Sequence, residues 1–137
     1  MGTLGKRQST RPSKVLEAFE NPKVGALYMV ECATREFTCL CPLTGQPDFA
    51  RIFMRYVPGS RCVELKSFKL YLWSYRDEGA FHEDVVNRML TDLVETLDPI
   101  WLEVRGDFEV RGGIAASVSA RHGILPPGLE DVEPIDL

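Results

Sequence analysis

Residues 83–104 read EDVVNRMLTDLVETLDPIWLEV, and this stretch decides the class of fold. Its apolar residues recur at intervals of three and four, the spacing of one face of an α-helix. They are Val85, Val86, Met89, Leu90, Leu93, Val94 and Leu97. Two acids, Glu83 and Asp84, suit the positive end of the helix dipole, and Pro99 ends the pattern. We therefore predict a helix over 83–97, followed directly by a strand.

Beyond this helix, apolar and polar residues alternate as they do in half-buried strands. The alternation predicts strands over 100–104, 108–110 and 114–118, with a hairpin turn at Arg105-Gly106-Asp107. Before the helix, a second set of apolar residues at helical spacing predicts another helix with these side chains on one face. The set is Leu65, Phe68, Leu72 and Tyr75.

Two more strands are predicted ahead of both helices, over 26–33 and 49–57. Between them, residues 41–48 hold two prolines and a glycine, which indicates a loop. The order strand, strand, helix, helix, strand, strand predicts an α+β domain, with an antiparallel sheet and two helices on one face. The edges of such a sheet need cover, so we expect subunits to pair into a closed assembly.

The length of 137 residues fits one domain, which we place at 15–123. Residues 1–14 form a polar N-terminal tail, and residues 124–137 a Pro-rich acidic C-terminal segment. Sixteen Lys+Arg against twenty Asp+Glu give a net charge of −4, which argues against nucleic acid as a direct partner. The sequence has no apolar run of membrane-spanning length and no signal-peptide pattern. We expect a cytoplasmic protein without a membrane partner.

The four cysteines are Cys32, Cys39, Cys41 and Cys62. In a reducing compartment we expect no disulfide between them. A zinc site is not expected either, because no C-x-x-C pair occurs and the chain has two histidines. Cys32 and Cys62 fit the role of small buried side chains.

Cys41 differs because it opens the loop at 41–48, and Asp48 closes the same loop. A loop restrained by Pro42 and Pro47 can bring both side chains to one small site. A nucleophile and a proton donor would then act on the two atoms of one polarised multiple bond. A buried cysteine beside a turn-capping aspartate is the structural alternative.

Other polar residues suit a ligand. Glu83, next to His82 at a helix start, can accept two N–H donors from a guanine-like ring edge, and helix capping is the alternative. Lys66 and Lys69 share a helix face and can hold phosphates together with Arg111, and a solvated charged face is the alternative. The sequence has no Gly-rich phosphate-loop motif, so a nucleotide would bind outside a Rossmann or P-loop frame.

Three strings occur in order: CPLTGQPDFA at 41–50, ELKSFKLYL at 64–72 and FHED at 81–84. Together they resemble the NADPH-dependent 7-cyano-7-deazaguanine reductases, the nitrile reductases of queuosine biosynthesis, in their short single-module form. The resemblance covers roughly residues 25–123. It implies the tunnelling fold, in which subunits assemble into a barrel with active sites between them.

The resemblance also implies roles for individual residues. Cys41 matches the nucleophile that attacks the nitrile carbon to give a covalent thioimidate, and Asp48 matches the acid that protonates the nitrile nitrogen. Five residues match those that bind 7-cyano-7-deazaguanine: Val63, Glu64, Leu65, His82 and Glu83. Lys66, Lys69 and Arg111 lie where the family holds NADPH, two molecules of which reduce the nitrile to the aminomethyl group of 7-aminomethyl-7-deazaguanine. No metal is implied.

Three alternatives remain open. A zinc hydrolase like GTP cyclohydrolase I needs histidine and cysteine ligands that this sequence does not place together. The archaeal amidinotransferase that adds ammonia to the same nitrile lacks the segment ELKSFK, which stands here at 64–69. A non-catalytic purine-binding module needs no nucleophile, so reaction of Cys41 with the nitrile distinguishes it.

Overall fold

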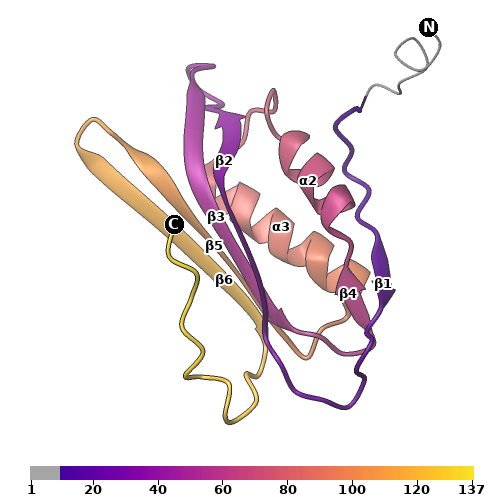
Figure 1. Ribbon diagram of the computed structural model, residues 1–137. Coiled ribbons are helices and arrows are strands. Elements are labelled where there is room, and N and C mark those ends of the chain that lie inside the picture. The colour runs from indigo at the N-terminus through magenta and orange to yellow at the C-terminus, as the bar shows by residue number, and fades with distance from the viewer. Residues whose placement is uncertain (1–9) are drawn as a thin grey trace, which may run out of the picture.

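A sheet and a layer of helices make up the computed structural model, which describes residues 10–137. The four-stranded sheet has the order β2-β3-β5-β6, with every neighbouring pair antiparallel. Its strands are β2 (Val30–Leu40), β3 (Pro47–Val57), β5 (Trp101–Arg111) and β6 (Ile114–Gly123). Two helices occur within residues 10–137, α2 (Leu65–Trp73) and α3 (His82–Leu97), and both cover one face of the sheet (Figure 1). The predicted α+β architecture is confirmed.

Helix α3 packs on the sheet through the apolar stripe that the sequence predicts. Its buried side chains are Val85, Val86, Met89, Leu93 and Leu97. Alternate residues of β3 face them from the sheet, since the side chains of a strand point to opposite faces in turn. These are Ala50, Ile52, Met54 and Tyr56, each about 1% exposed. The core therefore lies between α3 and the middle of the sheet.

The predicted apolar face of the first helix is wrong in part. Phe68 and Tyr75 are buried, but Leu65 is 60% exposed, and Tyr71 is buried in its place. Helix α2 ends at Trp73, so Tyr75 belongs to the turn that follows and not to the same helical face.

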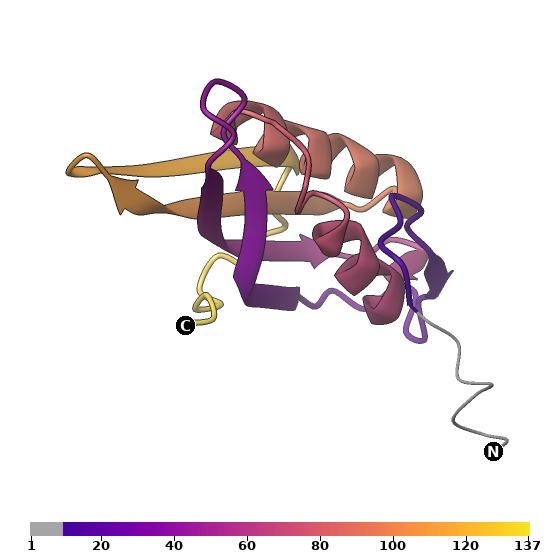
Figure 2. The same ribbon diagram turned by 90° about the horizontal axis from the view of Figure 1, so that it is seen from above.

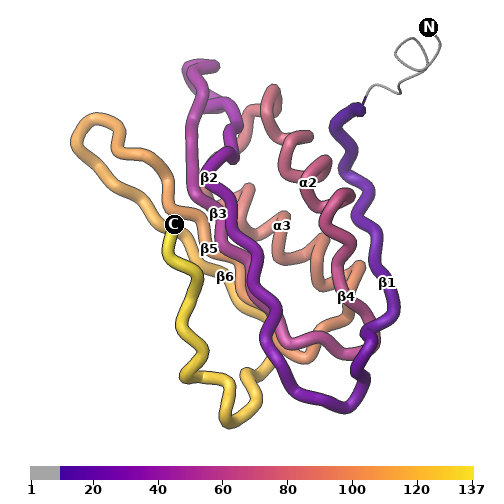
Figure 3. Tube along the Cα trace, viewed as in Figure 1, coloured from indigo at the N-terminus to yellow at the C-terminus, as the bar shows by residue number. Residues whose placement is uncertain are grey.

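The hairpin turn predicted at Arg105-Gly106-Asp107 is also wrong. These residues lie inside β5, where Gly106 pairs with Ile52 on one side and Val118 on the other. The chain reverses instead at Gly112-Gly113, whose φ angles of +57° and +78° suit a tight hairpin turn. That turn projects beyond the layer of helices (Figure 3).

Strand boundaries differ from the prediction at the start of the sheet. The strand predicted over 26–33 begins at Val30 and continues to Leu40, and the next begins at Pro47 rather than Phe49. Two short strands that the sequence did not predict, β1 (Ala18–Glu20) and β4 (Arg61–Val63), form a separate antiparallel pair. Of the predicted tail at 1–14, residues 1–9 lie outside the described part of the chain.

The C-terminal segment lies on the face of the sheet opposite to the helices (Figure 2). There Arg51 donates to the carbonyl of Leu137 at 3.1 Å, and Arg55 donates to the carbonyl of Val132 at 3.3 Å. Strands β2 and β6 are the two edges of the sheet. In the part of the chain from residue 10 onward, neither helix is long and apolar enough to cross a membrane.

Candidate active site

A closed turn over residues 41–46 joins β2 to β3 and carries Cys41. The Cys41 N–H donates to the carbonyl of Gln46, and the Cys41 carbonyl accepts from the N–H of Gly45, both at 2.8 Å. Gly45 has a φ of +72°, which glycine adopts without a steric penalty. The Gln46 N–H donates to the hydroxyl of Thr44 at 3.2 Å, so the turn is bonded across its width.

The turn favours the thiolate of Cys41, the form in which a cysteine is a nucleophile. The Thr44 hydroxyl and the backbone N–H groups of Leu43 and Thr44 hold the pKa of the half-buried Cys41 thiol below its usual value, although burial and the charge of Asp48 oppose this. Cys39, two residues earlier and fully buried, is the contrast. Burial, with the nearby charge of Asp48, raises the pKa of Cys39 to about 11.

Asp48 lies opposite Cys39 in the β2–β3 register and is 5% exposed. Its carboxylate is bonded to the guanidinium of Arg111, at the end of β5. The Nε2 atom of His82 lies 3.5 Å from the other carboxylate oxygen. Asp48 is thus buried on the helix-facing side of the sheet, next to the turn that carries Cys41.

His82 is the first residue of α3, and its ring stacks on Phe108 with the centroids 3.7 Å apart and the planes 8° from parallel. Stacking fixes the imidazole beside Asp48. Glu83 follows in the first turn of α3, where its side chain is exposed. The structure therefore brings Cys41, Asp48 and His82 to one end of the molecule.

Arg111 occupies a position that the sequence did not predict. Its guanidinium bonds to Asp48 and also to the side chain of Gln46, so it links β5 to the β2–β3 turn. Gln46 is the site residue that sequence reasoning missed. The feature of the sequence that could have indicated Gln46 is its position between Gly45 and Pro47, inside the predicted loop at 41–48.

The three residues predicted to line the base, Val63 to Leu65, lie away from this cluster. Val63 and Glu64 precede α2, and Leu65 begins it. The nine residues of α2 span about 13 Å, and the chain returns toward the turn at 41–46 only after the helix ends. The Glu64 carboxylate caps α2 by accepting the N–H groups of Lys66 and Ser67, each at 2.8 Å. Val63 is buried and Leu65 is exposed.

A groove of about 580 Å³ separates α2 from the free edge of β2. Its lining includes Phe37, Leu65, Phe68, Lys69, Leu72 and Arg76. Lys66 is exposed one turn before Lys69. The acids Glu31 and Glu36 line the β2 side of the groove, so it is the α2 side, with its cations and apolar wall, that suits a phosphate-bearing, ring-containing cofactor such as NADPH. No cluster of three or more residues able to hold a metal ion occurs among the described residues.

Known proteins resemble this chain over most of its length. A sequence model of the family described as QueF-like protein matches residues 47–126. The NADPH-dependent 7-cyano-7-deazaguanine reductase of Anaeromyxobacter dehalogenans (strain 2CP-C) is 61% identical over 120 residues, which are 88% of this chain and 98% of that protein. The protein of the same name from Thioalkalivibrio sulfidiphilus is 56% identical over 114 residues, 83% of this chain and 88% of that protein.

A solved structure shares the fold. The crystal structure of the archaeosine synthase QueF-Like in the apo form has a TM-score of 0.65 and 21% identity, over 76% of this chain and 100% of that chain. Fold and site together define a tunnelling-fold protein with a cysteine and an aspartate at a strand hairpin. The chain belongs to the family of NADPH-dependent 7-cyano-7-deazaguanine reductases. The resemblance stated from the three sequence strings is confirmed.

Proposed function

We propose that this protein reduces the nitrile of 7-cyano-7-deazaguanine to the aminomethyl group of 7-aminomethyl-7-deazaguanine, with NADPH as the reductant, in queuosine biosynthesis. The observation that carries the proposal is the β2–β3 hairpin, in which the turn bearing Cys41 leads directly to the buried Asp48, whose carboxylate contacts Arg111 and His82. A nitrile is a poor acceptor of hydride because negative charge would develop on a bare nitrogen. Thiolate attack coupled to protonation removes this barrier.

In the first step the Cys41 sulfur bonds to the nitrile carbon, and one of the carbon–nitrogen π bonds breaks. Asp48 accepts the proton of the Cys41 thiol as the sulfur adds and passes it to the nitrogen, which gives a neutral thioimidate and returns Asp48 to its carboxylate form. Hydride addition and departure of the Cys41 thiolate then leave an imine. A second hydride and a proton give the amine, so two NADPH and two protons in total balance the whole reaction. NADPH supplies both hydrides when bound.

His82 and Glu83 are proposed to hold the deazaguanine base beside Cys41. The exposed carboxylate of Glu83 can accept two ring N–H groups, and the stacked ring of His82 adds a fixed polar edge. Val63, Glu64 and Leu65 complete the base site from a second copy of the chain, because about 13 Å of helix separates them from the turn within one copy.

Lys66 and Lys69 are proposed to hold the phosphates of NADPH. Arg111 joins them only by leaving Asp48 and Gln46, to which it is bonded in this structure.

A homo-oligomeric barrel accounts for the free edges of the sheet. Strands β2 and β6 can pair between copies, and a site between subunits follows from the placement of Val63 to Leu65. We place the enzyme in the cytoplasm, where its four free thiols stay reduced. Its net charge of −4 argues against a direct nucleic-acid partner.

The decisive experiment mixes the protein with the nitrile without NADPH and measures the intact mass. We expect a gain equal to one molecule of nitrile, because addition expels no atom. Cys41→Ala should show no gain and no turnover, whereas the control Cys32→Ala should react like the wild type. No adduct on the wild type would favour a binding module or a hydrolase.

A second measurement separates reduction from amidine formation, since both reactions can begin with the same adduct. Supplied with NADPH, the adduct should be consumed with oxidation of two NADPH per amine. Supplied with ammonia alone, it should persist. Release of an amidine without NADPH oxidation would contradict the proposed reduction.

A further inference from the structure

The segment between α2 and α3 forms a backbone bridge with the end of β2. The Leu40 N–H donates to the carbonyl of Glu78 at 2.9 Å, and the Leu40 carbonyl accepts from the N–H of Ala80 at 3.0 Å. Leu40 directly precedes Cys41. Because β2 is an edge strand, β3 bonds it on one side only, and this bridge supplies the other side at the base of the turn.

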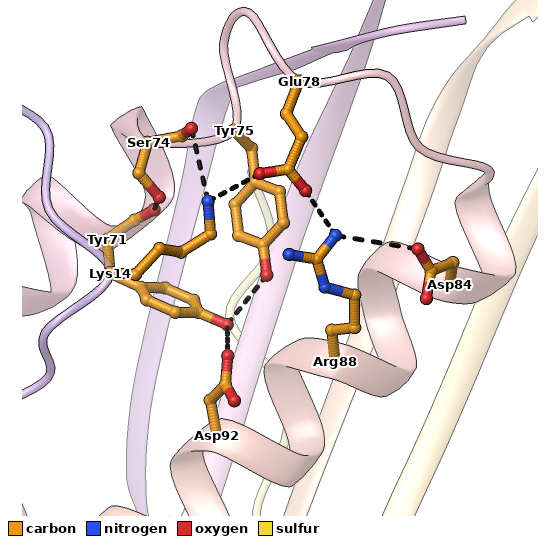
Figure 4. A network of polar contacts seen from close by, with 8 residues as sticks. All are labelled: Lys14, Tyr71, Ser74, Tyr75, Glu78, Asp84, Arg88 and Asp92. Atoms are coloured by element: carbon orange, nitrogen blue, oxygen red, sulfur yellow. Dashed lines mark hydrogen bonds and ion pairs between the residues drawn. The ribbon is translucent and has the colours of Figure 1, made fainter. Parts of the chain in front are cut away.

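The side chain of Glu78 is held by two cations from distant parts of the chain (Figure 4). Lys14, ahead of β1, donates to one carboxylate oxygen at 2.9 Å. Arg88, on α3, bonds to the other oxygen and lies 3.7 Å from Asp84. Partial burial opposes ionisation of Glu78, but the hydrogen bonds from Lys14 and Arg88 outweigh it and hold its pKa below the usual value.

The same two cations enclose the buried ring of Tyr75. The Lys14 Nζ lies 4.1 Å from the ring centroid, and the guanidinium carbon of Arg88 lies 5.2 Å from it. The Tyr75 hydroxyl is 2.9 Å from that of Tyr71, which donates to Asp92 at 2.6 Å. Isolated surface ion pairs order little, but a network seated on a buried aromatic pair has a defined geometry.

We propose that Glu78 is a positioning residue for Cys41. Its two ion pairs fix the segment 78–80 against Leu40, and this segment fixes the base of the turn at 41–46. The inference rests on the proposed function only in taking Cys41 as the nucleophile.

Two effects of neutralising Glu78 have opposite signs at the thiol. Removing a negative charge near the site favours the thiolate and cannot raise the pKa of Cys41. Loosening the turn weakens the hydrogen bonds from Thr44 and Leu43 that lower this pKa, and so raises it. Asp48, which opposes the thiolate, stays paired with Arg111 and His82 in either case. A rise in the pKa of Cys41 in Glu78→Gln therefore indicates that the turn has lost its positioning, because loss of the charge alone would not raise it.

The test compares Glu78→Gln with Asp77→Asn, a neighbouring exposed acid that loses the same charge. Alkylation of Cys41 by iodoacetamide is followed against pH by peptide mass, with melting temperature as the check on folding. We expect the midpoint for Glu78→Gln to move to higher pH and the nitrile adduct to form about 10- to 100-fold more slowly. The dissociation constant of the nitrile, measured in a Cys41→Ala background, should stay unchanged.

A midpoint for Glu78→Gln that equals or lies below that of Asp77→Asn overturns the proposal. If Glu78→Gln does not fold, Glu78→Asp keeps the charge but shortens the side chain that reaches Lys14 and Arg88, and it should shift the midpoint in the same direction. No shift in that variant also overturns it. A wild type that alkylates normally but forms no nitrile adduct would reject the proposed function, while the alkylation profiles still decide the role of Glu78.

Discussion

Asp48 is the residue whose replacement separates chemistry from structure most directly. It is 5% exposed and paired with Arg111, so an isosteric amide fits the same space. An amide cannot deliver a proton to the nitrogen that becomes negative as sulfur adds. We expect Asp48→Asn to fold but to form the adduct about 10²- to 10⁴-fold more slowly, the usual contribution of a general acid.

Adduct formation is followed by intact mass over time, and folding by the melting temperature. Asp107→Asn is the matched control, since Asp107 is also paired with an arginine but stands on β5 in the polar ladder of Arg105 and Ser117. It should react at the wild-type rate. A rate for Asp48→Asn within a few-fold of the wild type would remove Asp48 from the mechanism.

The sequence was enough to predict that Cys41 and Asp48 lie near each other, because a short loop with two prolines limits where both side chains can go; their roles in the reaction stay a prediction. It was not enough to place Arg111, which meets Asp48 across 63 positions of sequence. That contact depends on the register of β3 against β5, and the spacing of residues in the sequence does not reveal which residues pair between two strands. Gln46 was missed for the same reason, since its partner is Arg111.

At the scale of elements, Gly106 sets how closely α3 approaches the sheet. A Cβ at this position would lie 2.9 Å from the Phe108 ring, 3.1 Å from Val86 and 3.4 Å from Ile52. These neighbours belong to the packed core, so they cannot move aside freely. We expect Gly106→Ala to lower the free energy of unfolding by about 1–3 kcal/mol, the usual cost of overpacking.

Urea unfolding measures this change. Gly79→Ala is the control, because its added Cβ would lie 3.5 Å from the Cα of Pro42, an ordinary van der Waals contact. Its stability should stay close to that of the wild type. Equal midpoints for Gly106→Ala and Gly79→Ala would mean that α3 does not press on the sheet there.

The same glycine explains an error in the sequence prediction. Arg105-Gly106-Asp107 has the composition of a hairpin turn, yet its glycine serves close packing inside β5, and Gly112-Gly113 makes the turn. Local composition cannot distinguish these uses of glycine, because two of the side chains that a Cβ would meet, Val86 and Ile52, come from other elements, α3 and β3. Helix α3 itself was predictable since its stripe of apolar residues is long and unbroken.

For the whole molecule, acid stability should depend on Glu103. This residue lies between Arg55 and Arg121 on neighbouring strands, at 3.0 Å and 2.6 Å, and is 9% exposed. Burial opposes its ionisation, but hydrogen bonds from Arg121 and Arg55 outweigh burial and lower its pKa from 4.5. A lowered folded-state pKa means that the stabilisation is present above about pH 4.5 and is lost as the pH falls through the folded value.

We expect Glu103→Gln to cost about 1–3 kcal/mol at pH 7. The difference from the wild type should shrink as the pH is lowered from 5 toward 3, because the unfolded chain then binds a proton at Glu103 that the folded state resists. Melting temperatures of both proteins from pH 7 to pH 3 measure this convergence. A difference that stays constant over that range would show that the ionised form of Glu103, paired with Arg55 and Arg121, contributes nothing to stability.

Cys41 follows β2 and Asp48 lies on β3, two strands that the sheet holds with different numbers of backbone bonds. Strand β3 is bonded along both sides, whereas β2 has one full neighbour and the short bridge at Leu40. Thermal fluctuations concentrate where backbone bonds are fewest. Within one copy of the chain, Asp48 is therefore held by more sheet bonds than the turn at Cys41, so the position of the thiol depends more than that of the acid on contacts from outside the sheet, such as the segment 78–80.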